Sequence, residues 1–233
     1  MSPVPFGGLY QRLQQQQIPI LHGFSPAVIP KPYDWADWAY VTGYWFLEHS
    51  PEWQPPADLV DFIKSGTPPI YVGFGSMSER NPEATLNLVL QALKKTGQRG
   101  ILLSDWQGFS DSELPDIFPI KSAVPHDWLF PQCCAAIHHG GAGTTAAALR
   151  AGIPSIVIPF GVDQPFWGQR VADLGVGSSP IPQKQLNVVQ LSDAIQTVMH
   201  QDILTRAQAL GEQIRQEDGV GKTVAIINQY LEG

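Results

Sequence analysis

The sequence of 233 residues has two cysteines, few basic residues and no long apolar run. Cys133 and Cys134 are adjacent, and neighbouring cysteines rarely pair without strain, so neither a disulfide framework nor a cysteine metal site is expected. A formal net charge of −7 argues against the basic face that nucleic-acid phosphates require. No segment approaches the roughly 20 apolar residues of a membrane helix, and the N-terminal residues lack a signal-peptide pattern. We therefore expect a cytoplasmic protein with no transmembrane segment and no nucleic-acid partner.

What the sequence does contain is a hydrophobic fraction of 43%, enough for a sizeable core, arranged as an α/β pattern after residue 69. Short apolar runs alternate there with helical segments, which predicts a parallel sheet with right-handed crossovers. The predicted fold class is α/β, a Rossmann-like parallel sheet with helices on both faces. The expected strands are Ile70–Phe74, Gly100–Leu103, Ile117–Ile120, Ala135–His138, Ser155–Ile158 and Val176–Ser178.

Helices are expected wherever apolar residues recur at three- and four-residue spacing. Pro82–Thr96 has Asn81 in front of it as an N-cap and proline at its first position. The C-terminal part of the chain is predicted to be helical over Val188–Met199, Ile203–Gln216 and Val220–Leu231. The first 55 residues are rich in tryptophan and proline and show no sustained period of helix or strand.

Residues 135–164 form the most informative segment, because they read as a strand, a glycine-rich loop, a helix and a second strand. Gly140, Gly141 and Gly143 allow a sharp bend and a close approach to a ligand. A helix is expected over Thr144–Ala151, closed by Gly152. The unpaired N–H groups at the start of that helix and its dipole favour an anion, so the segment predicts a phosphate or diphosphate site.

Four motifs give the sequence a resemblance to a known family. The chain resembles the C-terminal, nucleotide-sugar-binding half of the UDP-glycosyltransferases with the two-domain GT-B fold, most closely sterol glucosyltransferases and bacterial antibiotic glycosyltransferases. The similarity runs from about Phe24 to the C-terminus. The motifs are GFGSM at 73–77, VPHDWLF at 124–130, HHGGAGTT at 138–145 and PFGVDQPFWG at 159–168.

The resemblance implies an inverting, metal-independent transfer of a hexose, usually glucose, from a UDP-sugar that is a co-substrate, with no cofactor. It places Val124 and His126 beside the uracil and has Asp163 and Gln164 bind the sugar hydroxyls. Ser76 would face the phosphates from the opposite side. Ala147 stands where plant members carry an acidic residue, so the resemblance does not extend to ribose recognition by that carboxylate. The diphosphate-binding residues implied are His139, Gly141, Ala142, Gly143 and Thr144.

The resemblance also implies a division of labour between two halves. Residues 1–55 are similar to the end of the N-terminal half and the linker, and residues 56–233 to the UDP-sugar-binding domain with its C-terminal helices. The family keeps its general base in the N-terminal half, so no catalytic base is expected in this chain. The expected partners are UDP-glucose or a related UDP-hexose, a sterol or other hydrophobic alcohol, and an N-terminal half in trans or a second copy. A lipid acceptor would bring the protein to the periphery of membranes.

Two other functions remain open at this point. A non-catalytic nucleotide-sugar-binding module, or half of a split enzyme, fits the same motifs. An NAD-dependent oxidoreductase is favoured by GAGTTA at 141–146, which fits a dinucleotide fingerprint, with Asp163 about 20 residues beyond it. That fingerprint usually follows the first strand of its domain, whereas three predicted strands come earlier here.

Overall fold

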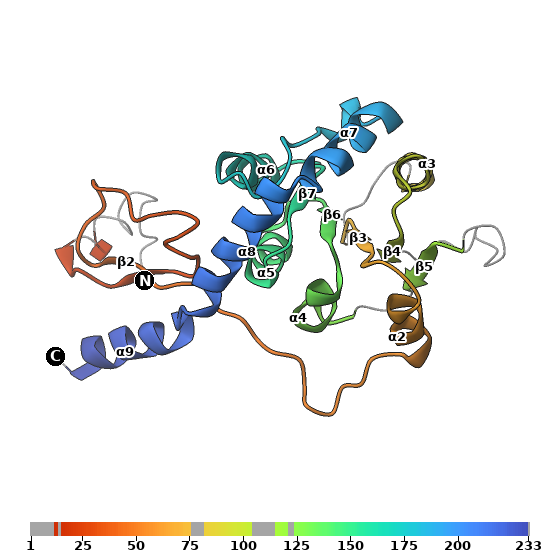
Figure 1. The fold of residues 1–233 in the computed structure, drawn as a ribbon. Helices are drawn as coiled ribbons and strands as arrows, with labels where there is room; N and C mark the ends of the chain where they lie inside the picture. Colours follow the sequence, from red (N-terminus) through yellow and green to blue (C-terminus); the bar gives the residue numbers. More distant parts are fainter. Residues whose placement is uncertain (1–11, 14, 76–81, 104–114, 121–123, 233) are drawn as a thin grey trace, which may run out of the picture. The chain divides into compact units, whose positions relative to one another are not determined.

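The computed structural model describes residues 12–13, 15–75, 82–103, 115–120 and 124–232 (Figure 1). The chain forms two compact units. Unit 1 comprises residues 1–47 and 213–233, and unit 2 comprises residues 48–212. The boundary at residues 55 and 56 that the resemblance implies stays a prediction. The two units are described separately below.

Unit 2 contains a five-stranded parallel sheet with the strand order β5-β4-β3-β6-β7. The first strand of the unit therefore lies in the middle, and the chain winds outward from it in both directions. This is the doubly wound order of a Rossmann-like sheet, in which ligands bind where the strand order reverses, here between β3 and β6. The strands are β3 (Ile70–Gly73), β4 (Gly100–Leu103), β5 (Ile117–Ile120), β6 (Ala135–His138) and β7 (Ser155–Val157).

Helices cover both faces of this sheet, which confirms the predicted fold class (Figure 1). On one face, α3 (Pro82–Thr96) and α7 (Val188–Val198) bury leucine, isoleucine and valine side chains against the strands. On the other face, α2 (Ala57–Lys64), α4 (His126–Leu129) and α5 (Ala142–Ala151) enclose a second apolar cluster. Alternate residues of the strands point to opposite faces, so β3, β4 and β6 each contribute to both clusters.

Most predicted elements are found within a residue or two of their expected bounds, and one strand is wrong. Val176–Ser178 forms only an isolated bridge between Gly177 and Ser155. Gly175 before it has a φ of +66°, and Pro180 follows it. The chain therefore touches the edge of β7 and turns away before a ladder can form.

Helix beginnings are the other point of difference. The helix after the glycine loop was expected to begin at Thr144 but α5 begins at Ala142, with Gly141 as its N-cap residue. Asn81, expected to cap α3, lies outside the described residues. The remaining helices of unit 2 are α6 (Gln164–Asp173), α8 (Gln201–Arg215), which runs into unit 1, and two 3-10 turns, Phe130–Gln132 and Gln183–Gln185.

The described residues of unit 1 include two short parallel strands and the helix α9. The strands are β1 (Ile20–His22) and β2 (Ala39–Val41), and the helix is α9 (Gly219–Glu232). The turn before α9 packs on the chain after β1, where Ser25 Oγ donates a 2.6 Å hydrogen bond to Glu217 Oε1. A Cβ atom on Gly219 would lie 2.3 Å from the Tyr44 carbonyl oxygen, so this contact requires glycine.

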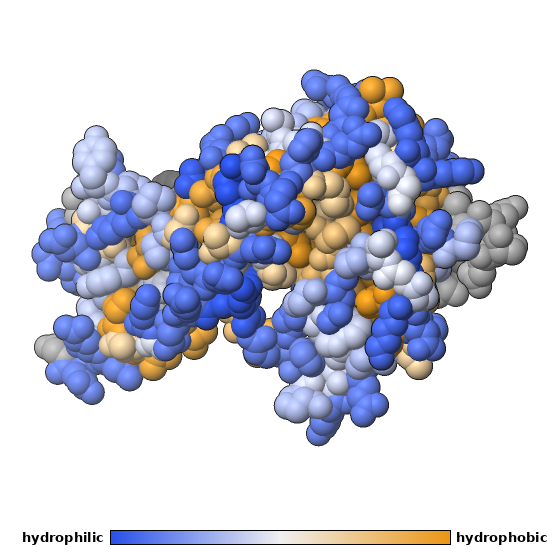
Figure 2. Space-filling view, in the orientation of Figure 1, coloured by the Kyte–Doolittle hydropathy of each residue, from blue (hydrophilic) through white to orange (hydrophobic). Residues whose placement is uncertain are grey.

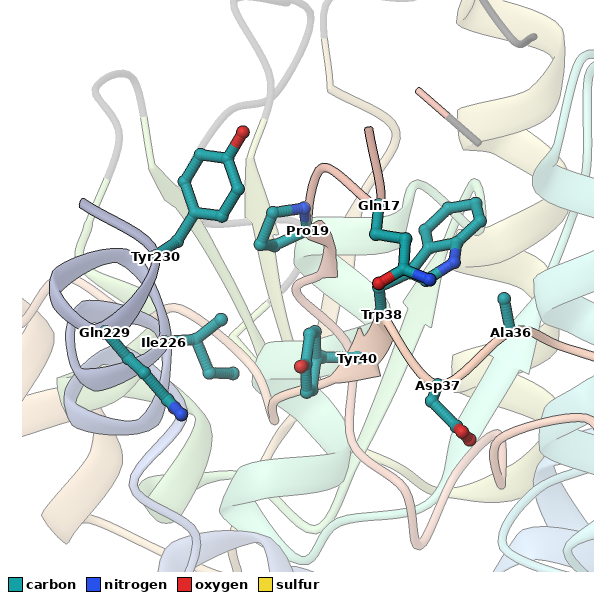
Figure 3. Close-up of a pocket in the computed structure, with 9 residues that line it drawn as sticks. All are labelled: Gln17, Pro19, Ala36, Asp37, Trp38, Tyr40, Ile226, Gln229 and Tyr230. Carbon is teal, nitrogen blue, oxygen red and sulfur yellow. The ribbon is translucent and has the colours of Figure 1, made fainter. Parts of the chain in front are cut away.

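Much of the apolar surface of unit 1 is exposed. Along α9, four apolar side chains at helical spacing are between 42% and 74% exposed: Val220, Val224, Ile227 and Leu231. Figure 2 shows apolar residues at the surface where α9 lies. A cavity of about 690 Å³ opens between α9 and the β1–β2 region (Figure 3). Its lining includes Pro19, Trp38, Tyr40, Ile226 and Tyr230.

Candidate functional site

The predicted site residues gather at the carboxyl ends of neighbouring strands of unit 2. The loop after β6 and the first turn of α5 carry His139 to Thr144, and the loop after β7 and the start of α6 carry Asp163 and Gln164. The loop after β3 reaches Gly75, while Ser76 lies outside the described residues. Because β6 lies between β3 and β7 in the sheet, the three loops meet at one edge.

The glycine loop after β6 has a backbone that only glycine fits. Gly140 has a φ of +88°, and its N–H donates a 3.1 Å hydrogen bond to His138 Nδ1. A Cβ atom there would lie 2.6 Å from Val157 Cγ1 and 3.0 Å from the Gln164 carbonyl oxygen. The loop after β6 therefore packs directly against β7 and the loop that follows it.

The first turn of α5 is open where this loop ends. Ala142 and Gly143 are exposed, and a Cβ atom on Gly143 would meet no atom of the described residues within 4 Å. The first N–H groups of a helix have no partner within it, and the helix dipole adds partial positive charge there. The turn therefore presents backbone donors that suit a phosphate group.

His139 borders this turn with a half-buried ring. A Cβ atom on Gly141 would lie 2.5 Å from His139 Nε2, and one on Gly75 would lie 3.1 Å from its Cε1, so the ring fits between two glycines. Burial lowers the pKa of His139 below its usual value, although the Gly73 backbone and the Asp163 carboxylate oppose that shift. His139 is therefore neutral at pH 7 and can bind a proton when an anion approaches.

His138, its neighbour, has a supporting role. The side chain is fully buried, and burial together with His139 and His126 lowers its pKa to about 3. Because Nδ1 accepts the Gly140 N–H, the proton of this neutral ring is on Nε2. Nε2 has no hydrogen-bond partner among the described residues. His138 thus anchors the glycine turn from below.

The loop between β7 and α6 is held in an unusual conformation. Val162 has a φ of +58°, which is rare for a β-branched residue, and its side chain is 95% exposed. Gln164 is buried, and its Oε1 accepts hydrogen bonds from the Phe160 N–H at 2.8 Å and the Gly161 N–H at 3.2 Å. Asp163 is exposed, between the strained residue and the buried amide. That Asp163 and Gln164 bind a sugar stays a prediction. In the structure, Gln164 Oε1 instead accepts hydrogen bonds from the backbone of its own loop.

The VPHDWLF motif contains the whole of α4. Val124 is buried, and the His126 ring stacks on Phe130 with a centroid separation of 4.3 Å. His126 Nε2 lies 3.4 Å from the Tyr71 hydroxyl of β3. Burial lowers the pKa of His126, so its ring is neutral at pH 7 although Asp127 opposes the shift. The motif is therefore tied to β3.

The structure also places together residues that the sequence did not associate. His49 Nδ1 lies 2.7 Å from Asp127 Oδ2, and the His49 N–H donates to the same oxygen at 2.9 Å. Burial would raise the pKa of Asp127, but these hydrogen bonds outweigh it and lower the pKa to about 2. Trp53 contacts Trp128 edge to face at 5.4 Å. Residues 48–53 thus pack on α4, a contact between residues 78 positions apart that no local pattern could reveal.

This arrangement can bind an anion through backbone donors and place a carboxylate and a histidine near it. Among the described residues, no group of three His, Cys, Asp or Glu side chains is arranged to bind a metal ion. None of the described helices is long and apolar enough to cross a membrane. The glycine fingerprint 141–146 follows β6, whereas the dinucleotide fingerprint belongs after the first strand, which here is β3.

Comparison with known families and proteins agrees with this architecture. Residues 89–223 match the family described as Erythromycin biosynthesis protein CIII-like, C-terminal domain. The chain is 42% identical to sterol 3-beta-glucosyltransferase UGT80A2 of Arabidopsis thaliana over 215 residues, which is 91% of this chain and 34% of that protein. It is 45% identical to sterol 3-beta-glucosyltransferase of Emericella nidulans over 235 residues, 95% of this chain and 16% of that protein.

Two solved structures share the fold at 19% sequence identity. The glycosyltransferase of kitacinnamycin has a TM-score of 0.70 and aligns over 90% of this chain and 53% of its own. CalG4, the calicheamicin glycosyltransferase, has a TM-score of 0.71 and aligns over 91% and 52%. The chain therefore spans about half the length of these structures, and 34% and 16% of the length of the two sterol glucosyltransferases above.

Proposed function

This chain belongs to the erythromycin biosynthesis protein CIII-like family of C-terminal domains, and from that premise we propose that it is the donor-binding half of a UDP-dependent glycosyltransferase. The reaction is the transfer of a hexose, glucose above all, from a UDP-sugar to the hydroxyl of a sterol or similar lipid alcohol. It inverts the anomeric carbon and uses neither a metal ion nor a cofactor.

The observation that carries this proposal is the open first turn of α5. It lies at the point where the strand order reverses, next to a loop whose glycines leave room for a ligand. In the proposed complex the N–H groups of Ala142, Gly143 and Thr144 bind the diphosphate. His139 donates a further hydrogen bond, and Ser76, which follows β3 in the sequence, is a further proposed contact.

The neighbouring loops bind the two remaining parts of the donor, the uracil and the hexose. Val124 and His126, at the start of α4, border the uracil. Asp163 and Gln164, after β7, bind the hexose hydroxyls. Charge that develops on UDP as the glycosidic bond breaks is stabilised by the helix dipole, the backbone donors and His139, which is how such a site favours the transition state.

The attacking hydroxyl needs a general base, which the donor-binding residues do not provide. We propose that the base belongs to an N-terminal half like that of the longer relatives, which binds unit 1 in trans or precedes it on the same polypeptide. We include three further points in this proposal. Two copies can associate through the surface of unit 1, the protein acts at the periphery of membranes on a lipid acceptor, and it is located in the cytoplasm.

A second candidate rests on the His49–Asp127 pair. A histidine held by a carboxylate is the usual form of such a base, and the two side chains are 33% and 17% exposed. In this alternative, the chain is catalytic by itself. A third candidate, a binding module without activity, requires only the donor site.

Calorimetry with the isolated chain tests the donor site directly. UDP and UDP-glucose should bind and NAD should not. His139→Ala should weaken UDP binding by about 1–3 kcal/mol, the scale of a lost charge-assisted hydrogen bond. His200→Ala, in unit 2 but away from the site loops, is the matched control and should leave the affinity unchanged. Preferential NAD binding would overturn the proposal.

A further inference from the structure

Asp163 is the N-cap residue of α6, but its side chain does not cap the helix. An aspartate at the N-cap accepts a hydrogen bond from the backbone of the first turn. Asp163 has φ −87° and ψ −8°, a helical conformation, and its side chain makes no capping hydrogen bond. Its Oδ2 instead accepts a 2.9 Å hydrogen bond from Trp167 Nε1. The orientation of this carboxylate is therefore set by the tryptophan.

Trp167 is itself fixed by packing. It is only 9% exposed, and the next residue, Gly168, is so close to β7 that a Cβ atom would lie 3.0 Å from Val157 Cγ1. Phe166 contacts the Trp167 ring edge to face at 5.2 Å. A buried indole N–H needs an acceptor, and Asp163 provides it. The pair is a rigid unit attached to the edge of the sheet.

The chain in front of Asp163 is held just as firmly. Val162 keeps its left-handed conformation because the amide oxygen of Gln164 binds the N–H groups of Phe160 and Gly161 on its other side. Strained backbone of this kind persists only where the surroundings hold it, and it is concentrated at functional sites. Both sides of Asp163 are therefore fixed, although its carboxylate is exposed.

We propose that Trp167 is a positioning residue that selects the sugar: its indole N–H holds Asp163 Oδ2, so that Oδ1 alone meets the hexose hydroxyls in one orientation. This inference rests on the proposed function and adds a residue that sets its sugar specificity. A carboxylate that is free to rotate can follow either epimer of a hydroxyl, whereas a fixed one favours a single stereochemistry. Trp167 does not touch the donor and acts only through Asp163.

The test measures binding of UDP, UDP-glucose and UDP-galactose to the full chain by calorimetry. Trp167→Phe removes the N–H and keeps most of the apolar volume. It should leave the affinity for UDP within about twofold, weaken UDP-glucose by about three- to tenfold, and reduce the preference for glucose over galactose. Trp53→Phe is the matched control: Trp53 is another partly buried tryptophan of unit 2, away from this loop, and its substitution should not change the preference.

Combination with Asp163→Ala separates positioning from a general structural effect. If Trp167 acts through Asp163, Trp167→Phe should add no further loss of UDP-glucose affinity in the Asp163→Ala background. Additive losses, or equal losses for UDP and UDP-glucose, would overturn the positioning role. Absence of UDP binding by the unaltered chain would instead overturn the proposed function itself, and this inference with it.

A measurement on the unaltered chain guards against misfolding of Trp167→Phe. The seven tryptophans give seven indole N–H signals in a nitrogen–proton correlation spectrum. The Trp167 signal should shift on addition of UDP-glucose much more than on addition of UDP. An identical shift with both ligands contradicts the inference.

Discussion

The two units of the chain differ in how completely their apolar surfaces are covered. Unit 2 has a five-stranded sheet with buried clusters on both faces, and the first turn of α5 is open toward the proposed ligand. Unit 1 has two strands of three residues each and a helix with an exposed apolar stripe. Parallel sheets are normally covered on both faces, and two strands alone are marginal. Among the described residues, the apolar faces of unit 2 are therefore covered, whereas the apolar stripe along α9 of unit 1 is exposed.

The largest expected effect comes from completing unit 1. With UDP-glucose and a sterol, the chain alone should form little glucoside. Addition of the N-terminal half of a plant sterol glucosyltransferase should raise the rate by about 10²-fold or more, the usual contribution of a general base. The measurement is transfer of labelled glucose to the sterol.

A His49→Ala variant makes that assay decisive. If the chain alone turns over rapidly and this variant does not, the base is the His49–Asp127 pair, and unit 1 is not needed for catalysis. Formation of a dimer instead of a complex with the added half would identify a second copy as the partner of unit 1.

A pair of identical substitutions compares the two units directly. Ile195→Ala, in the buried cluster of unit 2, should lower the free energy of unfolding by about 2–5 kcal/mol because it leaves a cavity. Ile227→Ala, on the α9 surface where the side chain is 42% exposed, should cost less than about 1 kcal/mol. Urea denaturation followed by circular dichroism measures both. Similar costs would mean that the α9 face is covered in solution.

Substitutions at two glycines of unit 2 distinguish an effect on stability from an effect on ligand binding. Gly140→Ala should destabilise the protein by about 1–3 kcal/mol, because it combines a positive φ with a contact at 2.6 Å. Gly143→Ala meets open space in the first turn of α5 and should leave stability unchanged or raise it by up to about 1 kcal/mol. It should nevertheless weaken UDP binding, because the added methyl occupies the approach to the backbone donors. Unchanged UDP affinity in a folded Gly143→Ala protein would place the phosphates elsewhere.

The most gradual expected effect concerns pH and the buried His138. Its pKa of about 3 in the folded protein lies below the ordinary value of 6.5, so the unfolded chain binds more protons between these values. Stability should therefore fall as the pH falls below 6.5, by up to about 1.4 kcal/mol per pH unit from this residue. His138→Asn keeps an acceptor for the Gly140 N–H and should show a shallower slope in urea titrations between pH 7.5 and about 5. Equal slopes would show that burial does not keep His138 neutral.

The sequence was most informative where a local pattern decides the structure. Strands β4, β5 and β6 have their predicted bounds, because each is a short apolar run between polar segments. The loops of the candidate site were found because glycine clusters mark backbone that other residues cannot adopt. No bounds were predicted for α6, which contains Gly168; glycine lowers helix propensity but is required where this helix approaches Val157.

Contacts between distant residues left no trace in the sequence pattern. The His49–Asp127 pair and the packing of Trp53 on Trp128 depend on the path of residues 48–56 over α4. The Trp167–Asp163 hydrogen bond spans four residues, but it could not be inferred before α6 was known to be a helix. The β1–β2 pairing was also missed, since strands of three residues are too short for a visible alternation.

The side chain that is missing at Gly141 has a consequence for how ligand and fold are linked. A serine or aspartate in that place would cap α5, whereas glycine leaves the first turn of α5 without a side-chain cap. A diphosphate that binds there becomes the cap, so that the ligand completes a secondary-structure element of its own host. A ligand at 100 times its dissociation constant adds about 2.7 kcal/mol to the stability of the folded state. Donor binding and folding are thus coupled equilibria, and the folded state is least stable where the ligand is scarce.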